Sequence, residues 1–259
     1  MQPWNIAHRG GAALSPENTL AAFEDAMARG CDGAELDVQL TSDGIVVVHH
    51  DFRLKAGLAR KNGVWLTEPG PRIKDLPLEA LRQFDVGTAQ PGSSYAQAHP
   101  LLKPANAFVP TLEEVAALAA SRRFMLFVEL KCDMSEDSAD PVALADAAFK
   151  VTGDWAIYVG FDWRALARIR HLGGQCWFTT DKLPGVLSGD ARPVIDAIAQ
   201  SGGQGWFPNF PDATPENVAY ARQRGLKVGV WTVNDPTDMQ RLMGLDAICT
   251  DRPDLLFRL

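Results

Sequence analysis

Residues 33–50 read GAELDVQLTSDGIVVVHH, and this stretch is the most informative about the fold. Two apolar runs, Gly33–Leu40 and Ile45–His49, flank the short segment TSDG. A crossover between parallel strands needs roughly a dozen residues, so these runs cannot be parallel neighbours. Asp-Gly between apolar runs is typical of a β-hairpin instead. The stretch therefore predicts an antiparallel pair in which facing residue numbers sum to about 85, which places Glu35 opposite His50.

Outside this hairpin, short apolar runs alternate with amphipathic stretches along almost the whole chain. The apolar runs predict strands at Asn5–Arg9, Phe124–Lys131, Ala156–Phe161, Gln175–Thr179, Gly205–Phe207, Leu226–Val233 and Ala247–Thr250. The amphipathic stretches predict helices at Pro16–Ala28, Leu78–Phe84, Leu112–Ala120, Pro141–Phe149, Trp163–His171, Pro193–Gln200, Pro215–Arg224 and Pro236–Leu242. Such alternation is typical of parallel strands joined by right-handed crossovers.

Several helix ends are marked by their residue types. A proline follows Ser15, Asp140 and Thr214, and this pattern predicts an N-cap at each of them. Gly30 and Gly225 each follow an arginine and predict the ends of two helices.

The number of strands favours a barrel. The predicted strands are one too many for a (β/α)₈ barrel, and the hairpin accounts for the extra one. An open doubly wound sheet is the alternative, but no Gly-x-Gly-x-x-Gly turn follows any predicted strand. We therefore expect a single domain over residues 1–259, an α/β protein with the TIM (β/α)₈ barrel fold. Residues 52–110 are rich in Gly and Pro, and they predict a small insertion over one mouth of the barrel with one helix, Leu78–Phe84.

The composition is that of a soluble globular protein. Hydrophobic residues make up 46% and charged residues 22% of the 259 positions. The net charge of −7 argues against nucleic acid and anionic membrane surfaces as partners. No stretch approaches the roughly 18 apolar residues of a membrane span, and the N-terminus lacks a signal peptide, so we expect a cytoplasmic location. We expect buried, free thiols at the four cysteines, Cys31, Cys132, Cys176 and Cys249. Disulfides are the alternative.

Acidic residues gather at the predicted carboxyl ends of strands, where such a barrel places its active site. Glu35 and Asp37 lie two apart in one strand, so their carboxylates share a face, and Glu129 ends another strand. Three converging carboxylates repel one another unless a cation neutralises them. A hard divalent cation with oxygen ligands, Mg²⁺ or Ca²⁺, suits this set. The alternative is a structural network in which each carboxylate pairs with a nearby Arg or Lys.

Two of the five histidines, His8 and His50, fall at strand ends in the same mouth. Two imidazoles beside a metal centre suit acid–base catalysis near neutral pH. His49 must face the opposite side of its strand, so we expect a structural role for it. His99 lies in the insertion and His171 at a helix end, where solvated histidines are common.

Positive charge and one aromatic ring complete the mouth. Arg9 and Lys131 lie at strand ends, and an Arg fork beside a divalent metal favours a phosphate or a planar carboxylate. Trp231 stands among polar strand-end residues and could wall an organic group.

Taken in order, these motifs resemble the signature of glycerophosphodiester phosphodiesterases. The resemblance spans residues 5–253 and rests on His8-Arg9-Gly10-Gly11, Pro16-Glu17-Asn18-Thr19, Glu35-x-Asp37, His50-Asp51, Glu129-x-Lys131, Trp231-Thr232-Val233-Asn234 and Thr250-Asp251-x-Pro253. It implies a TIM barrel with an insertion after the second half of the hairpin. It also implies hydrolysis of a glycerophosphodiester to sn-glycerol 3-phosphate and an alcohol.

The resemblance also implies a role for each site residue. The acids Glu35, Asp37 and Glu129 would bind one divalent cation, Mg²⁺ or Ca²⁺. Acid–base catalysis would fall to the pair His8 and His50. The phosphate would lie against Arg9 and Lys131, and the glycerol against Trp231. This chain departs from many members at Gly160-Phe161, where they carry Ser-Phe.

Three alternatives stay open at this point. The nucleophile is either the substrate's own glycerol 2-hydroxyl, which gives a cyclic phosphate, or water. A lysophospholipid or another phosphodiester could replace the glycerophosphodiester, although the insertion offers only scattered apolar residues, Leu58, Val64, Trp65 and Leu66, to hold an acyl chain. A barrel that binds phosphodiesters without hydrolysis is the third alternative, and the presence of both histidines argues against it.

Overall fold

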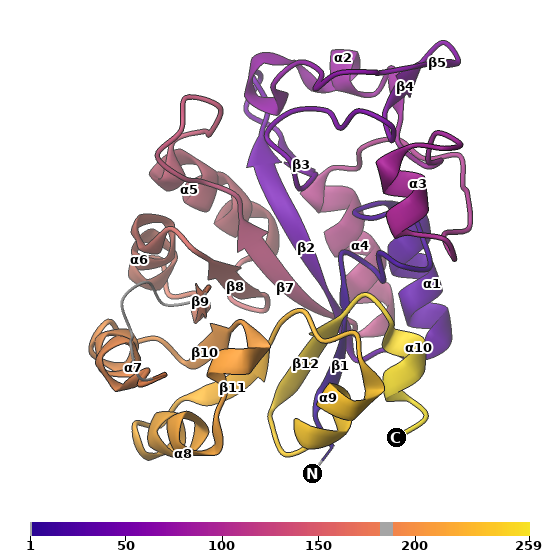
Figure 1. The fold of residues 1–259 in the computed structure, drawn as a ribbon. Helices are drawn as coiled ribbons and strands as arrows, with labels where there is room; N and C mark the ends of the chain where they lie inside the picture. The colour runs from indigo at the N-terminus through magenta and orange to yellow at the C-terminus, as the bar shows by residue number, and fades with distance from the viewer. Residues whose placement is uncertain (1, 182–188) are drawn as a thin grey trace.

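The computed structural model describes residues 2–181 and 189–259, and its central feature is a closed barrel of parallel strands (Figure 1). Around the barrel, β1 is followed by β12, β11, β10, β9, β8, β7 and β2, and β2 pairs again with β1. The strands are β1 (Trp4–His8), β2 (Gly33–Leu40), β7 (Met125–Leu130), β8 (Ile157–Gly160), β9 (Gln175–Thr180), β10 (Gly205–Pro208), β11 (Lys227–Val230) and β12 (Ala247–Thr250). The TIM barrel predicted from the sequence is confirmed.

The extra strand is β3 (Val46–Val48), which pairs with β2 in antiparallel orientation as the hairpin predicts. Val38 faces Val48, so the numbers of facing residues sum to 86. The predicted sum of about 85 is wrong by one. Glu35 does not face His50, because in this register Asp37 is opposite His49, whose backbone N–H donates to the backbone oxygen of Asp37 over 2.9 Å, and β3 itself ends at Val48.

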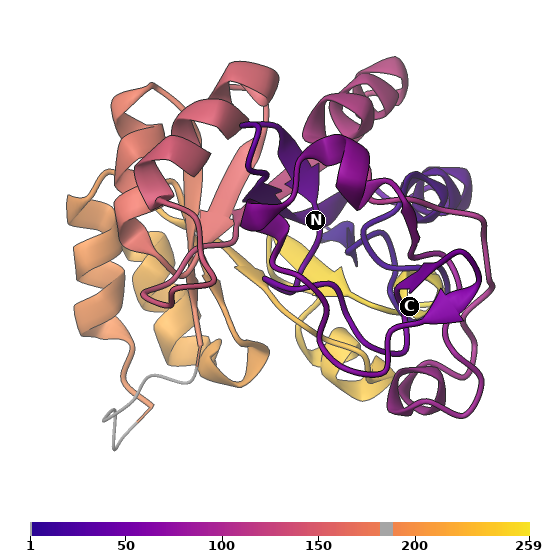
Figure 2. The same cartoon turned by 90° about the horizontal axis from the view of Figure 1, so that it is seen from above.

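The helices lie outside the ring of strands (Figures 1 and 2). They are α1 (Leu20–Arg29), α4 (Leu112–Arg122), α5 (Pro141–Thr152), α6 (Trp163–His171), α7 (Arg192–Gln200), α8 (Pro215–Gln223), α9 (Pro236–Arg241) and α10 (Pro253–Leu256). Outward-facing strand residues such as Leu36 and Val38 form one core with the helices. Inward-facing residues such as Phe127 and Trp177 form a second core inside the barrel. Both faces of the strands are therefore buried, which explains their apolar runs.

Helix α1 starts later than the sequence predicts. We expected Pro16 at its first position with Ser15 as the cap, but Thr19 is the N-cap, and its side chain accepts a hydrogen bond from the backbone N–H of Ala22. Asn18 has a φ of 57°, a left-handed conformation that interrupts a right-handed helix. The caps predicted for α5 and α8 and the glycine after α1 are confirmed.

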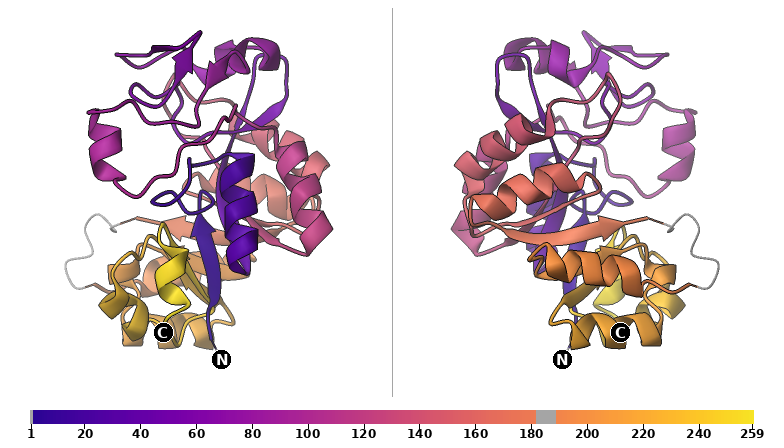
Figure 3. Two further views of the ribbon diagram at one scale, coloured as in Figure 1. Left: turned by 90° about the vertical axis from the view of Figure 1, so that its right-hand side faces the viewer. Right: turned by 90° about the vertical axis from the view of Figure 1, so that its left-hand side faces the viewer.

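The segment predicted as an insertion, residues 52–110, contains more structure than one helix. It holds β4 (Arg60–Lys61), β5 (Val64–Trp65), a 3₁₀ turn (Ile73–Asp75), α2 (Leu78–Leu81), β6 (Phe84–Asp85) and α3 (Ser94–Ala98). The predicted helix to Phe84 is too long, since α2 ends at Leu81, and the sequence reading missed α3. The insertion lies at the end of the barrel to which β2 points, away from both chain termini (Figures 1 and 3).

Two smaller expectations can be compared with the structure. Within the described ranges, no helix is long and apolar enough to cross a membrane. All four cysteines are buried and unpaired, as predicted.

Candidate active site

A cavity of about 180 Å³ lies at the carboxyl ends of the barrel strands. Seven of the eight predicted site residues line it, namely His8, Arg9, Glu35, His50, Glu129, Lys131 and Trp231. The eighth, Asp37, is only 1% exposed, and its Oδ2 lies 3.3 Å from Nε of Arg9. Side chains from five separate segments of the chain therefore meet at one place.

The three acidic residues form a compact cluster. Glu35, Asp37 and Glu129 each offer a carboxylate oxygen within 4.8 Å of the others. Asp37 of β2 faces Glu129 of β7, and alternation along β2 brings Glu35 to the same side. Oε1 of Glu35 is buried and finds no hydrogen-bond partner among the described residues. Burial, together with the two neighbouring carboxylates, raises the pKa of Glu35 well above its usual value. An orphaned carboxylate oxygen within an all-oxygen cluster fits a hard divalent cation.

Two cations share the cluster. Nε of Arg9 lies 3.3 Å from Asp37, and Nζ of Lys131 lies 2.8 Å from Glu129 and 3.7 Å from Asp37. Burial alone would raise the pKa of Asp37, but Arg9 and Lys131 contribute to holding it well below its usual range. The ion-pair network that the sequence left open thus exists for Asp37 and Glu129. Among the described residues no Arg or Lys side chain pairs with Glu35, whose Oε2 accepts the backbone N–H of Arg9 and lies 3.8 Å from Nε2 of His8.

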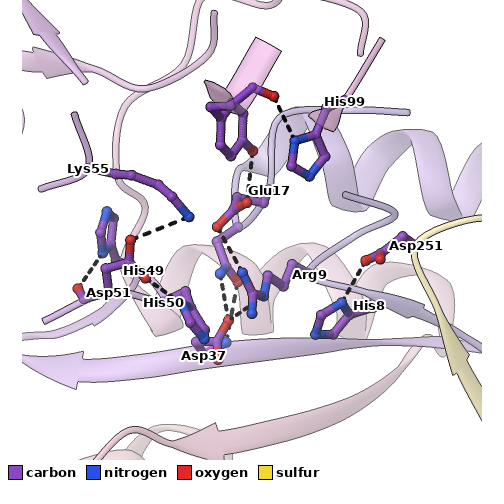
Figure 4. Close-up of polar contacts among 12 residues, drawn as sticks. His8, Arg9, Glu17, Asp37, His49, His50, Asp51, Lys55, His99 and Asp251 are labelled. Carbon is purple, nitrogen blue, oxygen red and sulfur yellow. Dashed lines mark hydrogen bonds and ion pairs between the residues drawn. The ribbon is translucent and has the colours of Figure 1, made fainter. Parts of the chain in front are cut away.

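Each histidine of the cavity is held by an aspartate (Figure 4). Nδ1 of His8 lies 2.6 Å from Asp251 Oδ1, and Nδ1 of His50 lies 2.6 Å from Asp51 Oδ1. Burial acts to raise the pKa of both carboxyls, but the hydrogen bonds from the histidines and nearby charges lower it overall. Because an ionised carboxylate can only accept hydrogen bonds, each Nδ1 carries a proton and donates a hydrogen bond to the aspartate. In the neutral ring, Nε2 then carries the lone pair.

The other three histidines lie outside the cavity. His49 is 8% exposed and its Nδ1 donates to the backbone oxygen of Asp51, 2.8 Å away. Burial lowers the pKa of His49, which favours a neutral ring. His99 stacks on Tyr95, and His171 ends α6. None of the three is among the residues that line the cavity within the described chain.

The turn after β1 explains why a glycine follows Arg9. Arg9 has a φ of 52° and Gly10 a φ of 85°, so two successive residues adopt left-handed conformations. A Cβ atom at Gly10 would lie 2.6 Å from Cβ of Ala22 in α1. This close approach excludes a side chain at residue 10 and positions Arg9 at the cavity.

Several residues near the site had no assigned role from the sequence. Asn18 donates to Asp37 Oδ2 over 2.8 Å, and Asn234 donates to Asp251 Oδ2 over 2.7 Å. Asp51 and Asp251 orient the two histidines. Each of them stands inside one of the seven motifs, so the motifs were the available signal. Their contacts depend on the paths of loops, which strand periodicity does not predict.

An aromatic wall borders the cavity near Trp231. Its indole Nε1 donates to the backbone oxygen of Phe207 over 3.0 Å. The ring of Phe161 lies edge-on to it, with centroids 5.5 Å apart at 90°. Gly160 supplies no hydroxyl here, but its backbone N–H donates to Thr179 Oγ1, and Thr179 itself lines the cavity.

Comparisons with known sequences cover nearly the whole chain. Residues 8–255 match the glycerophosphoryl diester phosphodiesterase family. The uncharacterized protein YqiK of Bacillus subtilis (strain 168) is 34% identical over 256 residues, which cover 96% of this chain and 95% of YqiK. A glycerophosphodiester phosphodiesterase of Caldanaerobacter subterraneus subsp. tengcongensis is 30% identical, over 98% of this chain and 96% of its own.

Solved structures agree with the sequence relatives. A putative glycerophosphoryl diester phosphodiesterase from Silicibacter pomeroyi superposes with a TM-score of 0.89 at 31% identity and covers 98% of this chain and 91% of its own. An Oleispira antarctica phosphodiesterase, solved in complex with the product sn-glycerol-3-phosphate, has a TM-score of 0.77 at 24% identity over 99% of this chain and 96% of its own, and it shows the shared fold. The chain therefore belongs to the glycerophosphoryl diester phosphodiesterase family and is an enzyme of that activity.

Proposed function

We propose that the cavity hydrolyses glycerophosphodiesters to sn-glycerol 3-phosphate and an alcohol, with one divalent cation and two histidines as acid and base. The observation that carries this proposal is the composition of one cavity. An acidic cluster with an orphaned oxygen on Glu35 lies beside two imidazoles, His8 and His50, that aspartates hold in one orientation.

The cation would be Mg²⁺ or Ca²⁺, held by Glu35, Asp37 and Glu129. When bound, it would withdraw charge from the phosphate oxygens. Arg9 and Lys131 stand beside the same carboxylates and would bind phosphate oxygens through charge-assisted hydrogen bonds. These fixed charges stabilise negative charge where it develops on the phosphate.

The two histidines would move the protons. Nε2 of one histidine accepts a proton from the attacking hydroxyl as the new P–O bond forms. The other histidine acts in its protonated form, and its Nε2 donates a proton to the alcohol oxygen as the old P–O bond breaks. The attacking hydroxyl belongs either to the glycerol C2 position or to water. In the first case water opens the cyclic phosphate in a second step.

The glycerol and the alcohol of the diester would lie in two different cavities beside the phosphate. We place the glycerol against Trp231 and Phe161. A second cavity, of about 530 Å³, shares His50 and Lys131 with the first and is lined in part by Phe52, Leu54, Ala56 and Pro69. We place the alcohol there. Because this lining includes apolar side chains, a lysophospholipid is the second candidate substrate.

A substrate comparison tests the proposal. We expect release of sn-glycerol 3-phosphate from glycerophosphocholine at a higher kcat/KM than release of choline from micellar lysophosphatidylcholine. The reverse order would replace the glycerophosphodiester by the lysolipid. Rapid hydrolysis of a 2-deoxyglycerol diester would exclude attack by the substrate's own hydroxyl.

We further propose that residues 1–259 act as one catalytic barrel in the cytoplasm. Two observations support this. The family match extends over residues 8–255, including the insertion. The buried, unpaired cysteines suit a reducing compartment.

A further inference from the structure

We propose that Tyr95, on helix α3 of the insertion, is a positioning residue for phosphate binding: its hydroxyl holds Glu17, and Glu17 holds the guanidinium of Arg9. The inference rests on the proposed function, in which Arg9 binds the phosphate. It gives the insertion a part in the reaction and explains the glutamate of the Pro16-Glu17-Asn18-Thr19 motif.

Both carboxylate oxygens of Glu17 are engaged. Oε1 accepts a hydrogen bond from Arg9 Nη1 over 3.0 Å (Figure 4), and Oε2 accepts one from the hydroxyl of Tyr95 over 2.8 Å. Glu17 is 8% and Tyr95 6% exposed. A carboxylate buried this deeply is stable only when paired and hydrogen-bonded. Burial acts to raise the pKa of Glu17, but Arg9, nearby cations and the Tyr95 hydroxyl lower it overall, so the group is ionised.

Glu17 completes the support of Arg9. The backbone N–H of Arg9 donates to Glu35 Oε2 over 3.2 Å, and Nε lies 3.3 Å from Asp37 Oδ2. Nη1 is held by Glu17. The contact at Nε is an ion pair without a hydrogen bond among the described residues, so the hydrogen bond from Nη1 to Glu17 orients the planar guanidinium. Without the Glu17 contact, Arg9 would be free to turn further toward Asp37 and away from the phosphate.

The aromatic ring of Tyr95 has separate contacts from its hydroxyl. The ring stacks on His99 with centroids 4.3 Å apart, and Lys55 Nζ lies 5.2 Å from its centre. Lys55 in turn lies 3.4 Å from Asp51, the aspartate that holds His50. Tyr95→Phe keeps all the ring contacts and removes only the bond to Glu17. This variant therefore isolates the contact that the proposal needs.

The first experiment compares two inhibitors. In Tyr95→Phe we expect kcat/KM for glycerophosphocholine to fall by about tenfold, the size of one charge-assisted hydrogen bond. Competitive inhibition by sn-glycerol 3-phosphate should weaken by about the same factor, whereas inhibition by glycerol should not change. If the bond only stabilises the insertion, Tyr95→Phe would lower the unfolding temperature and leave kcat/KM and both inhibition constants unchanged. That result would overturn the inference.

A matched control is available in Tyr220 of α8. Its hydroxyl donates to Asp196 over 2.9 Å, and it does not line the catalytic cavity. Tyr220→Phe removes the same kind of bond, and we expect unchanged kinetics and unchanged inhibition.

The second experiment tests the order of contacts with Glu17→Gln, which also keeps the shape of the side chain. If Tyr95 acts through Glu17, the double variant has the same kcat/KM as Glu17→Gln alone. Additive losses, or a Tyr95→Phe variant with wild-type kcat/KM, would overturn the inference. Arg9→Lys separates the two proposals. Full activity in Arg9→Lys would refute the role of Arg9 itself, whereas a loss there with none in Tyr95→Phe would refute only the inference.

Discussion

Adjacent histidines on one short segment have opposite environments, and this contrast can be tested directly. His50 lines the catalytic cavity, whereas His49 is buried against the backbone of Asp51. We expect His50→Ala to lower kcat by about 10²-fold or more, the usual contribution of a general acid or base. His49→Ala should keep near-normal kcat and lose stability, because it opens a space in a buried site. An inactive His49→Ala beside an active His50→Ala would show that the two side chains are exchanged.

The aspartate that holds each histidine gives a second test of the site. In Asp251→Asn the amide can offer an N–H to Nδ1 of His8 and favour the wrong tautomer, so kcat should fall by about 10²-fold. Asp254→Asn is the matched control, because Asp254 pairs with Arg252 and does not contact His8. Equal kcat values for the two variants would contradict the orienting role of Asp251.

Strand periodicity predicts which side chains share a face, but not what each one contacts. Glu35, Asp37, Glu129 and Lys131 could be brought together from the sequence because alternation and parallel strand ends suffice for that step. The contact between Glu17 and Tyr95 joins residues 78 positions apart, through a loop and an insertion. No local pattern predicts such a contact.

At the scale of elements, helix α1 offers a test of its observed start. Thr19 Oγ1 accepts from the N–H of Ala22 over 3.2 Å, whereas Ser15 Oγ donates to the side chain of Asp25 in the middle of α1 and is not the cap of the helix. Thr19→Ala should lower the free energy of unfolding by about 1 kcal/mol, the usual loss of an N-cap. Ser15→Ala should cost clearly less. Denaturant titration of both variants measures the difference, and the opposite ranking would place the helix start at Pro16.

The barrel strands could be predicted because each is buried on both faces and reads as an apolar run. The sequence predicts the wrong start for α1. Ser15-Pro16 has the residue types of an N-cap followed by proline, but Asn18 is left-handed, so the helix begins only after Thr19. Prediction from the sequence also failed in the insertion. β4, β5 and β6 are two residues each, too short for any periodicity. The hairpin was predicted correctly in kind, and its register was missed by one residue.

At the scale of the whole molecule, the acidic cluster couples stability to the proposed cation. A ligand that binds only the folded state stabilises it, by about 2.7 kcal/mol at a hundredfold excess over Kd. For a chain of 259 residues we expect the unfolding temperature to rise by on the order of 5 °C with saturating Mg²⁺ or Ca²⁺. Glu35→Gln should abolish most of this rise. An equal rise in both proteins would place the cation elsewhere.

The proposed reaction of this barrel is hydrolysis of a glycerophosphodiester with a cation held by Glu35, Asp37 and Glu129. The most direct measurement is release of sn-glycerol 3-phosphate from glycerophosphocholine, before and after EDTA treatment and with Mg²⁺ or Ca²⁺ added back. We predict that EDTA abolishes release in the wild type, that one of the two cations restores it, and that Glu35→Gln needs far more cation. Undiminished release in EDTA would contradict this proposal.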